Sequence, residues 1–369
     1  MDACPRRKQM KKLLSILLAV LMVFALVGCN KQQNNEGGEP AATGEDVAVF
    51  WYTYSDVYLS SVRAAMNDAM TAAGLNYKDY DANGSQADQT NQIDTALAAG
   101  AKVLVVNQVD TGSDDVTKTI LEKAEAAGAK VVFFNRGVSE DVLTAAGATF
   151  VGTDYEQAGH MEGKMIGEYL VGNYEATDLN GDGVIQYVMF KGDEANPEAI
   201  CRTQFGQEDA DAVLTAAGKP ALQYYDANAT TKYLLDANGT WSAAAANEHM
   251  ETVLSQYNAD NGNMIELVIA NNDDMALGAI ESLKNHGYNK DGETVIPVFG
   301  VDATEAAQAA IKEGSMTGTV KQDAVGMADA VTTIAKNLAA GADPFTGMNS
   351  AYEVVGSWRI NIPYSAYNG

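Results

Sequence analysis

The sequence predicts an α/β protein with two doubly wound lobes, each built on a parallel β-sheet. Short apolar runs typical of buried strands alternate with alanine-rich helical runs through most of the 369 residues. The alternation repeats in the second half with no tether-like linker between the halves, which indicates two similar lobes connected by more than one crossing. Short polar side chains also follow several strands, where open α/β sheets bind their ligands.

The first lobe is expected to contain strands at 47–51, 103–107 and 131–135, because each of these runs is short and apolar. Helical runs at 56–73 and 113–127 connect them. Strands joined through helices in this way pair in parallel, so the first sheet should be covered by helices on both faces.

The second lobe is expected to repeat this arrangement from residue 185 onward. Its predicted strands are 185–191, 222–225, 267–271, 298–302 and 318–321. Its predicted helices are 199–217, 241–256, 274–286 and 303–313, and the chain then continues into a further predicted helix at 323–340.

The chain should first cross between the lobes near residues 152–155. The predicted organisation is a signal peptide at 1–28, a flexible tether at 29–45, a first lobe at 46–153 plus about 322–358, and a second lobe at 154–321 plus about 359–369.

The N-terminal segment has the pattern of a lipoprotein signal. Basic residues between Arg6 and Lys12 precede an apolar run at 13–27, and a glycine stands directly before Cys29. A membrane-spanning helix would need about 20 apolar residues, more than this run supplies. We therefore expect export, with a lipid on Cys29 that anchors the protein to the outer face of the cytoplasmic membrane.

Charge and cysteine content exclude several classes of protein. The net charge of −25 opposes binding to nucleic acid, and removal of the basic signal makes the rest more acidic. Since Cys4 lies in the signal and Cys29 carries the lipid, Cys201 remains without a disulfide partner. A nucleophilic Cys201 would need a nearby histidine, so a structural thiol is the better interpretation.

Residues 178–186 (DLNGDGVIQ) have the pattern of a calcium-binding loop. Gly183 permits the sharp turn, and the twelfth position is Met189, so a carboxylate from elsewhere must complete the site. The alternative is a polar turn between a helix and a strand. The predicted loop ligands are Asp178, Asn180, Asp182, the carbonyl of Val184 and Gln186.

Polar side chains at the strand ends suggest a site for a polyol. Any one of them could simply cap a helix, but together with Arg202 they could bind neighbouring hydroxyls in one plane. The strand-end residues are Asp56, Asn107, Asn135, Asn272 and Asp302. Tyr58 and Trp241 could pack on the C–H faces of a sugar, although core packing would explain them equally well.

These motifs make the chain from about 47 to 364 resemble the periplasmic galactose/glucose-binding proteins of sugar ABC importers. The resemblance implies the periplasmic binding protein fold of the ribose/galactose type, in which a multi-stranded hinge joins the two lobes. It is densest at 131–135 (VVFFN), 178–186, 265–273 (IELVIANND), 296–303 (IPVFGVDA) and 362–364 (IPY).

The resemblance also implies roles for individual residues. Glu266 would complete a structural Ca²⁺ site, and the sugar would contact Asp56, Tyr58, Asn135, Arg202, Trp241, Asn272 and Asp302. Three further ligand positions depart from the family pattern: Asn196 and Glu198 replace a histidine and an aspartate, and Gln322 replaces an asparagine. Residues 227–240 look like an insertion in which Asp-Ala-Asn occurs twice. The sequence thus leaves open galactose, glucose or a related hexose or pentose.

The function implied is that of a monomeric receptor that closes on a monosaccharide and docks on a membrane permease. A chemotaxis receptor or kinase is the partner in the alternative, purely sensory function. A transcription regulator would need a basic DNA-binding motif ahead of the first lobe.

We do not expect an enzyme. Neighbouring carboxylates such as Asp193 and Glu194, or Asp273 and Asp274, point apart, so neither pair can serve glycoside hydrolysis. The three histidines have no zinc-ligand spacing.

Overall fold

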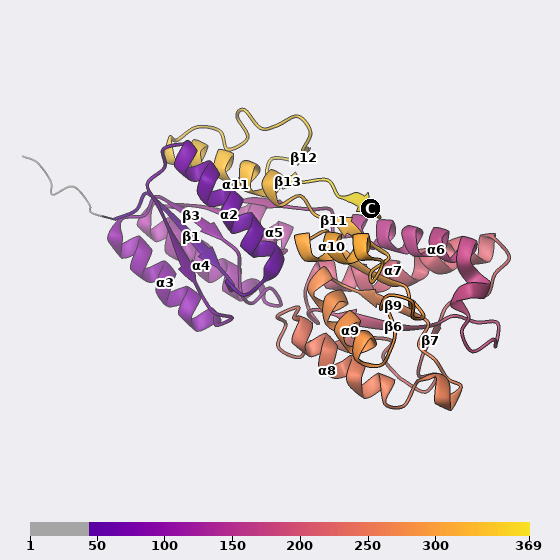
Figure 1. The fold of residues 1–369 in the computed structure, drawn as a ribbon. Helices are drawn as coiled ribbons and strands as arrows, with labels where there is room; N and C mark the ends of the chain where they lie inside the picture. The colour runs from indigo at the N-terminus through magenta and orange to yellow at the C-terminus, as the bar shows by residue number, and fades with distance from the viewer. Residues whose placement is uncertain (1–43) are drawn as a thin grey trace, which may run out of the picture. The chain divides into compact units, whose positions relative to one another are not determined.

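The computed structural model describes residues 44–369, and residues Thr43–Gly369 form one compact unit with two mainly parallel β-sheets (Figure 1). The predicted signal peptide, Cys29 and nearly all of the tether lie outside the described residues. Within 44–369, the structure contains no helix with the length and apolar character needed to span a membrane.

The first sheet has seven strands in the order β12-β13-β5-β4-β3-β1-β2. Its strands are β1 (Val47–Trp51), β2 (Tyr77–Asp81), β3 (Val103–Val106), β4 (Lys130–Phe134), β5 (Thr149–Gly152), β12 (Glu353–Val355) and β13 (Arg359–Asn361). The associated helices are α2 (Val57–Ala72), α3 (Gln86–Ala99), α4 (Asp114–Ala127), α5 (Glu140–Ala146) and α11 (Ala324–Ala339). All pairings are parallel except that of β12 with β13.

The second sheet follows the order β14-β11-β10-β9-β6-β7, with β8 also paired to β6. Its strands are β6 (Gln186–Lys191), β7 (Gln223–Tyr224), β8 (Leu234–Leu235), β9 (Leu267–Ala270), β10 (Val298–Asp302), β11 (Gly318–Lys321) and β14 (Ser365–Tyr367). The helices are α6 (Gln157–Thr177), α7 (Pro197–Ala216), α8 (Ala243–Leu254), α9 (Asp273–Asn285) and α10 (Glu305–Glu313), with a short 3₁₀ turn η2 (Ala259–Asn261).

The predicted fold class is confirmed, but several elements differ from the sequence prediction. β2 has the sequence YKDYD and none of its residues is fully buried, so it lacks the apolar run that marks a central strand. The chain leaves the first sheet for the last time only after β13, because Arg359–Asn361 pairs with β5. Residues 359–361 therefore lie in the first sheet, not with the second lobe as the sequence suggested.

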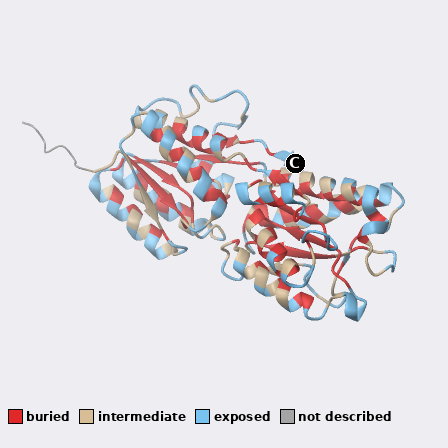
Figure 2. Ribbon diagram, viewed as in Figure 1, coloured by how far each residue is buried: buried red, intermediate tan, exposed pale blue. Residues whose placement is uncertain are grey.

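Apolar side chains on both faces of each sheet form the cores. All five residues of β1 (VAVFW) are buried, which explains why the central strands read as continuous apolar runs. Figure 2 shows the central strands of both sheets buried and the helices exposing their outer faces. Three segments cross between the sheets: β5 to α6, β11 to α11, and β13 to β14.

Helices α6 and α7 pack closely because glycines line the contact face of α6. A β-carbon at Gly159 would lie 2.6 Å from the carbonyl oxygen of Cys201, and one at Gly163 would lie 2.4 Å from that of Phe205. Glu162 lies in the same interface, with no exposed surface and no hydrogen-bond partner for either carboxylate oxygen. Burial raises the pKa of Glu162 to about 8.

Glu162 should make the stability of the protein fall as pH rises. Its pKa in the folded protein is about 8, above the reference value of 4.5. The protonated carboxyl therefore leaves the free energy of unfolding at its full value below pH 4.5, and this stability is lost as pH rises to about 8. At pH 7 the cost is on the order of 3 kcal/mol. Glu162→Met should therefore raise the free energy of unfolding at about pH 7 to 8, with little gain near pH 5, in denaturant titrations. The neutral Glu162→Gln should lose the same pH dependence; equal pH profiles for wild type and both variants would contradict this assignment.

Candidate functional site

The polar residues at the strand ends cap helices and also line a cavity. Asp56 accepts a hydrogen bond from the backbone N–H of Leu59 at the start of α2, at 2.8 Å. Asn272 accepts one from Met275 at the start of α9, at 3.0 Å. The second polar group of each side chain also has a protein partner: Asp56 Oδ2 accepts from the Tyr52 hydroxyl, and Asn272 Nδ2 donates to the Trp241 carbonyl. A ligand could therefore use only the remaining lone pair of Asp56 Oδ2 and the second N–H of Asn272.

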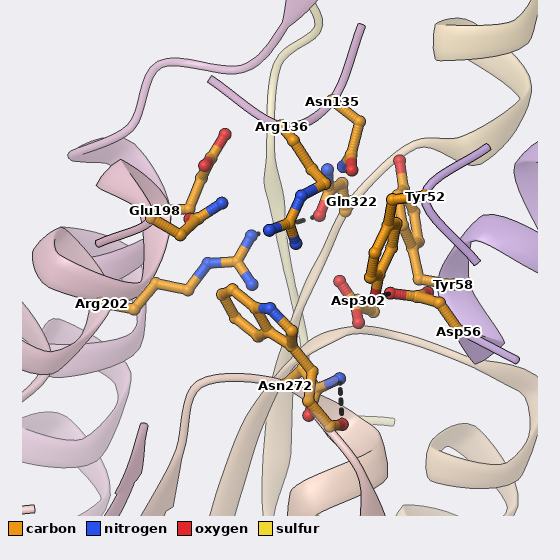
Figure 3. A pocket seen from close by; sticks show the side chains of 12 residues that line it. Tyr52, Asp56, Tyr58, Asn135, Arg136, Glu198, Arg202, Asn272, Asp302 and Gln322 are labelled. Carbon is orange, nitrogen blue, oxygen red and sulfur yellow. Dashed lines mark hydrogen bonds between the residues drawn. The ribbon is translucent and has the colours of Figure 1, made fainter. Parts of the chain in front are cut away.

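Twelve side chains surround this cavity, which encloses about 390 Å³ of space, part of it open to solvent (Figure 3). All ten residues proposed from sequence as sugar contacts line it, and two further residues, Tyr52 and Arg136, join them. The lining residues are Tyr52, Asp56, Tyr58, Asn135, Arg136, Asn196, Glu198, Arg202, Trp241, Asn272, Asp302 and Gln322. They come from both sheets and from the β11–α11 crossing, so the cavity lies between the lobes.

Tyr52 and Arg136 were missed in the sequence because their roles depend on contacts with residues elsewhere in the chain. Tyr52 follows β1 directly, and its hydroxyl donates to Asp56 Oδ2 at 2.7 Å. Arg136 follows Asn135, and its guanidinium lies 4.3 Å from the centre of the Tyr52 ring. Their position directly after predicted strands was the available signal.

The backbone is strained around the cavity. Positive φ angles occur at Asn135 (61°), Trp241 (57°) and Asp302 (124°). Asparagine tolerates this region better than other residues, but tryptophan and aspartate adopt it at a cost. Such strain persists only where the surrounding structure holds it.

Arg202 connects the cavity to the hinge. Its Nη1 donates to the carbonyl of Asn271 at 2.8 Å, and its Nη2 donates to Gln322 Oε1 at 3.2 Å and to the Tyr364 hydroxyl at 2.8 Å. Its Nε is buried without a partner. The centre of the Trp241 ring lies 5.6 Å from the guanidinium carbon, within cation–π distance.

The cavity contains acidic groups whose pKa values burial raises. Burial raises the pKa of Asp302 well above its usual value, and the positive charge of Arg202 only partly opposes this shift. Burial likewise raises the pKa values of Asp56 and Glu198. For Arg202, burial favours the neutral form, but nearby Tyr364, Asp302 and Glu198 outweigh it and raise its pKa. Hydroxyl groups of a ligand could satisfy these carboxylates without adding charge.

An ion pair joins the two lobes at the cavity. Arg136 Nη2 lies 2.9 Å from Asp193 Oδ2, with side chains that are only 6% and 17% exposed. Each partner is fixed within its own lobe: Arg136 Nε donates to the carbonyl of Gln108, and Asp193 Oδ1 accepts from the N–H of Ala195. The pair therefore stabilises the closed arrangement of the lobes.

Hydrogen bonds between side chains and backbone N–H groups hold the predicted calcium loop. Asp178 accepts hydrogen bonds from the N–H groups of Gly181 and Gly183, and both of these glycines have positive φ. Glu266 lies against the loop, where its two oxygens accept from the N–H groups of Leu179, Asn180 and Gln186. Among residues 44–369, no three His, Cys, Asp or Glu side chains form a metal cluster by themselves. A Ca²⁺ ion here would therefore need amide and carbonyl oxygens as well as carboxylates.

The paired carboxylates that might suggest an enzyme have structural partners. Asp273 accepts from the Thr319 hydroxyl and the Thr304 N–H, whereas Asp274 accepts from the Ala243 N–H. Burial raises the pKa of Cys201 to about 11, so this thiol is not an activated nucleophile.

The fold and the cavity define a two-lobed ligand-binding protein, and comparison with known proteins identifies its family. A family model for the periplasmic binding protein domain matches residues 47–343. The chain is 35% identical, over 81% of its length and 83% of the relative's, to the D-galactose/methyl-galactoside binding periplasmic protein of Haemophilus influenzae. It is 24% identical to the ribose import binding protein of Bacillus subtilis, over 85% and 88% of the two chains.

A solved structure supports the same fold. An ABC transporter solute binding protein from Bacillus halodurans with bound myo-inositol superposes with a TM-score of 0.64 at 23% identity, over 89% of this chain and 96% of that one. The chain belongs to the periplasmic binding protein family. Like its relatives, it is a solute-binding protein and not an enzyme, as the sequence predicted.

Breaking the ion pair between the lobes should shift the protein toward an open form. Asp193→Asn keeps an oxygen for the Ala195 N–H but loses its charge, and we expect the closed form to lose on the order of 1–2 kcal/mol. The radius of gyration from small-angle X-ray scattering should increase. Asp94→Asn is the matched control, because the Lys123–Asp94 pair lies within the first lobe. An equal response from both variants would show that the Arg136 contact has no special role in closure.

Proposed function

We propose that this protein is the substrate-binding component of an ABC importer and holds one monosaccharide, galactose or glucose, in the cavity between its lobes. The observation that carries the proposal is the combination of hydrogen-bonding side chains with Tyr58 and Trp241 around one cavity. Carboxylates and amides match the alternating hydroxyls of a sugar, and aromatic rings match its C–H faces. The name of the Haemophilus influenzae relative supports a galactose-like ligand.

The charges favour a neutral polyol over an ion. Glu198 Oε1 and Arg202 Nε are both buried without a hydrogen-bond partner, so two residues that line the cavity carry an unpaired acceptor and an unpaired donor. A bound anion would meet Asp56, Glu198 and Asp302, while a simple cation would leave the Arg202 donor unused. Hydroxyl groups of a polyol can donate to the three carboxyl groups and accept from the Arg202 guanidinium.

Binding would be coupled to closure. Asp56 and Asn135 belong to the first lobe, whereas Arg202, Trp241 and Asp302 belong to the second. Only the closed form brings both sets onto one sugar, so the sugar shifts the equilibrium toward it. The closed receptor would then present a surface to a membrane permease. Signalling to a chemotaxis or kinase partner is the alternative outcome of the same closure.

The choice of sugar would depend on three residues that depart from the family pattern. Gln322 uses its amide oxygen to accept from Arg202, and Asn196 uses its oxygen to cap α7. Their amide N–H groups therefore remain as donors. Glu198 is one methylene longer than the aspartate it replaces, and changes of this size alter preference by about 1–3 kcal/mol.

A panel of monosaccharides in thermal unfolding should reveal the ligand. One or two sugars should raise the melting temperature of the wild type, because a ligand at 100 times its dissociation constant adds about 2.7 kcal/mol of stability. Asp302→Ala should abolish this shift, since it removes a buried acceptor. Asp141→Ala, which changes an exposed first-turn residue of α5, should retain it. No shift with any sugar in the wild type would contradict the proposed function.

We further propose a structural Ca²⁺ ion in the loop, held by Asp178, Asn180, Asp182, Val184, Gln186 and Glu266. The amide groups of Asn180 and Gln186 now donate to Asp182 Oδ2, at 3.2 and 2.8 Å. Rotation of either amide by a half-turn exchanges its nitrogen and oxygen, and would supply the oxygen that calcium requires. Burial raises the pKa of Glu266, and a bound cation would offset this cost.

Calcium removal should lower stability only when the loop can bind the ion. A chelator should lower the melting temperature of the wild type and of Asp302→Ala by similar amounts. Glu266→Gln should remove most of the response, because it loses a negatively charged ligand. Asp260→Asn, in η2 and exposed, is the control and should respond like the wild type. A chelator response in Glu266→Gln equal to that of the wild type would contradict the assigned ligand set.

Export and lipid attachment at Cys29 remain proposals from the sequence. Mass spectrometry of the membrane-associated protein should detect a diacylated Cys29 as the first residue, and Cys29→Ser should release the protein from the membrane.

A further inference from the structure

The segment before Trp241 contains the tripeptide Asp-Ala-Asn twice, and the two copies have different surroundings. In both copies the aspartate accepts a hydrogen bond from the N–H two residues on: Asp226 from Asn228 at 2.9 Å, and Asp236 from Asn238 at 3.0 Å. Asp226 is only partly buried, whereas the side chain of Asp236 is 1% exposed. The second copy therefore does more than form a turn.

Asp236 holds the residues on both sides of Trp241. Its Oδ2 accepts from the Thr240 hydroxyl at 2.9 Å, from the Ser242 N–H at 3.1 Å and from the Ser242 hydroxyl at 3.2 Å. Its own N–H donates to the carbonyl of Lys191, at the end of β6. The carboxylate thus connects the short segment around Trp241 to the second sheet.

Trp241 needs such support. Its φ of 57° lies in the left-handed region, which a residue with a β-carbon adopts only at a cost. Its indole ring lies directly over Gly192, where an added β-carbon would approach Cδ2 to 2.1 Å. Its carbonyl accepts from Asn272 Nδ2 at 3.2 Å. The position of the indole ring therefore depends on two features: the strained Trp241 backbone must be fixed by its neighbours, and residue 192 must have no side chain.

The surrounding segment is itself fixed to the sheet. β8 (Leu234–Leu235) pairs in parallel with the end of β6. Tyr233 donates to Glu194 at 2.8 Å, and its ring lies 4.6 Å from Lys191 Nζ. Residues 227–240, which looked like an insertion in the sequence, therefore support the end of β6, from which one wall of the cavity extends.

We propose that Asp236 is a positioning residue for the aromatic wall of the cavity and thereby determines sugar affinity without touching the ligand. The proposal rests on the proposed function, because it assigns Asp236 to the same sugar site through Trp241. Loss of the carboxylate would release Thr240 and Ser242, and the strained Trp241 backbone would relax toward ordinary φ values. The indole would then leave the position that a sugar face requires.

The first test is sugar affinity by calorimetry in a set of matched variants. Asp236→Ala should weaken binding by about tenfold or more, since small displacements of binding groups have large effects. Asp236→Asn keeps one oxygen acceptor and should have an intermediate effect. Asp226→Ala removes the equivalent turn bond in the first copy and should bind like the wild type. Equal binding by Asp236→Ala and wild type would overturn the proposal.

The second test asks whether Asp236 acts through Trp241. In a double-mutant cycle, Asp236→Ala should add no further loss of affinity when Trp241 is already alanine. Equal losses in both backgrounds would mean a role separate from the ring. Gly192→Ala, which displaces the indole without altering the segment, should reproduce the loss; wild-type affinity in that variant would also overturn the proposal.

A measurement without sugar separates this inference from the proposed function. The near-UV circular dichroism of Asp236→Asn should differ from that of the wild type, and the difference should vanish in the Trp241→Ala background. If the wild type bound no sugar but this spectral coupling were present, the sugar function would fail while the positioning role stood. If sugar binding were intact and the spectral coupling absent, the positioning role would fail alone.

Discussion

The buried guanidinium of Arg202 is the group on which the site most depends. Because the guanidinium cannot lose its charge, its N–H groups need protein acceptors in place of the water that burial removes. Three acceptors are met: a carbonyl after β9, Gln322 in the crossing that leads to α11, and Tyr364 in the crossing that leads to β14. One cation thus ties together the second sheet and two of the three crossings, while its Nε is buried without a partner.

A second constraint comes from the helix N-termini that converge on the cavity. Their free N–H groups need acceptors, and Asp56, Asn196 and Asn272 supply them while keeping a second polar group for the ligand. The sequence seemed to require that each of these residues either cap a helix or contact a ligand, but in the structure the same residue caps a helix and lines the cavity. One atom of a short planar side chain can cap the helix, while the other keeps hydrogen-bonding capacity for a ligand even where it also contacts the protein, as Asp56 Oδ2 contacts Tyr52 and Asn272 Nδ2 contacts Trp241.

Much of the fold could be predicted because its signals are local. Apolar runs mark strands that are buried on both faces, as in β1 and β9, and the repeated alternation indicates parallel sheets. The predictions failed where burial was incomplete or contacts were distant. β2 carries charged residues at the sheet edge, and β13 was assigned to the wrong lobe because only its pairing with β5 shows which sheet it joins. Tyr52 and Arg136 were missed because their roles depend on each other and on Asp193, which lies on the other lobe.

The sequence by itself determined the fold class, the membership in a solute-binding family and the residue types around the cavity, because periodicity, turn chemistry and short motifs are properties of neighbouring residues. Only the tertiary structure decided which of these residues meet, how Arg202 is satisfied, that the two lobes are joined by an ion pair, and that the two Asp-Ala-Asn copies differ. These features depend on contacts between residues far apart in the chain, where burial and charge are set by the packing of whole elements and leave no local pattern.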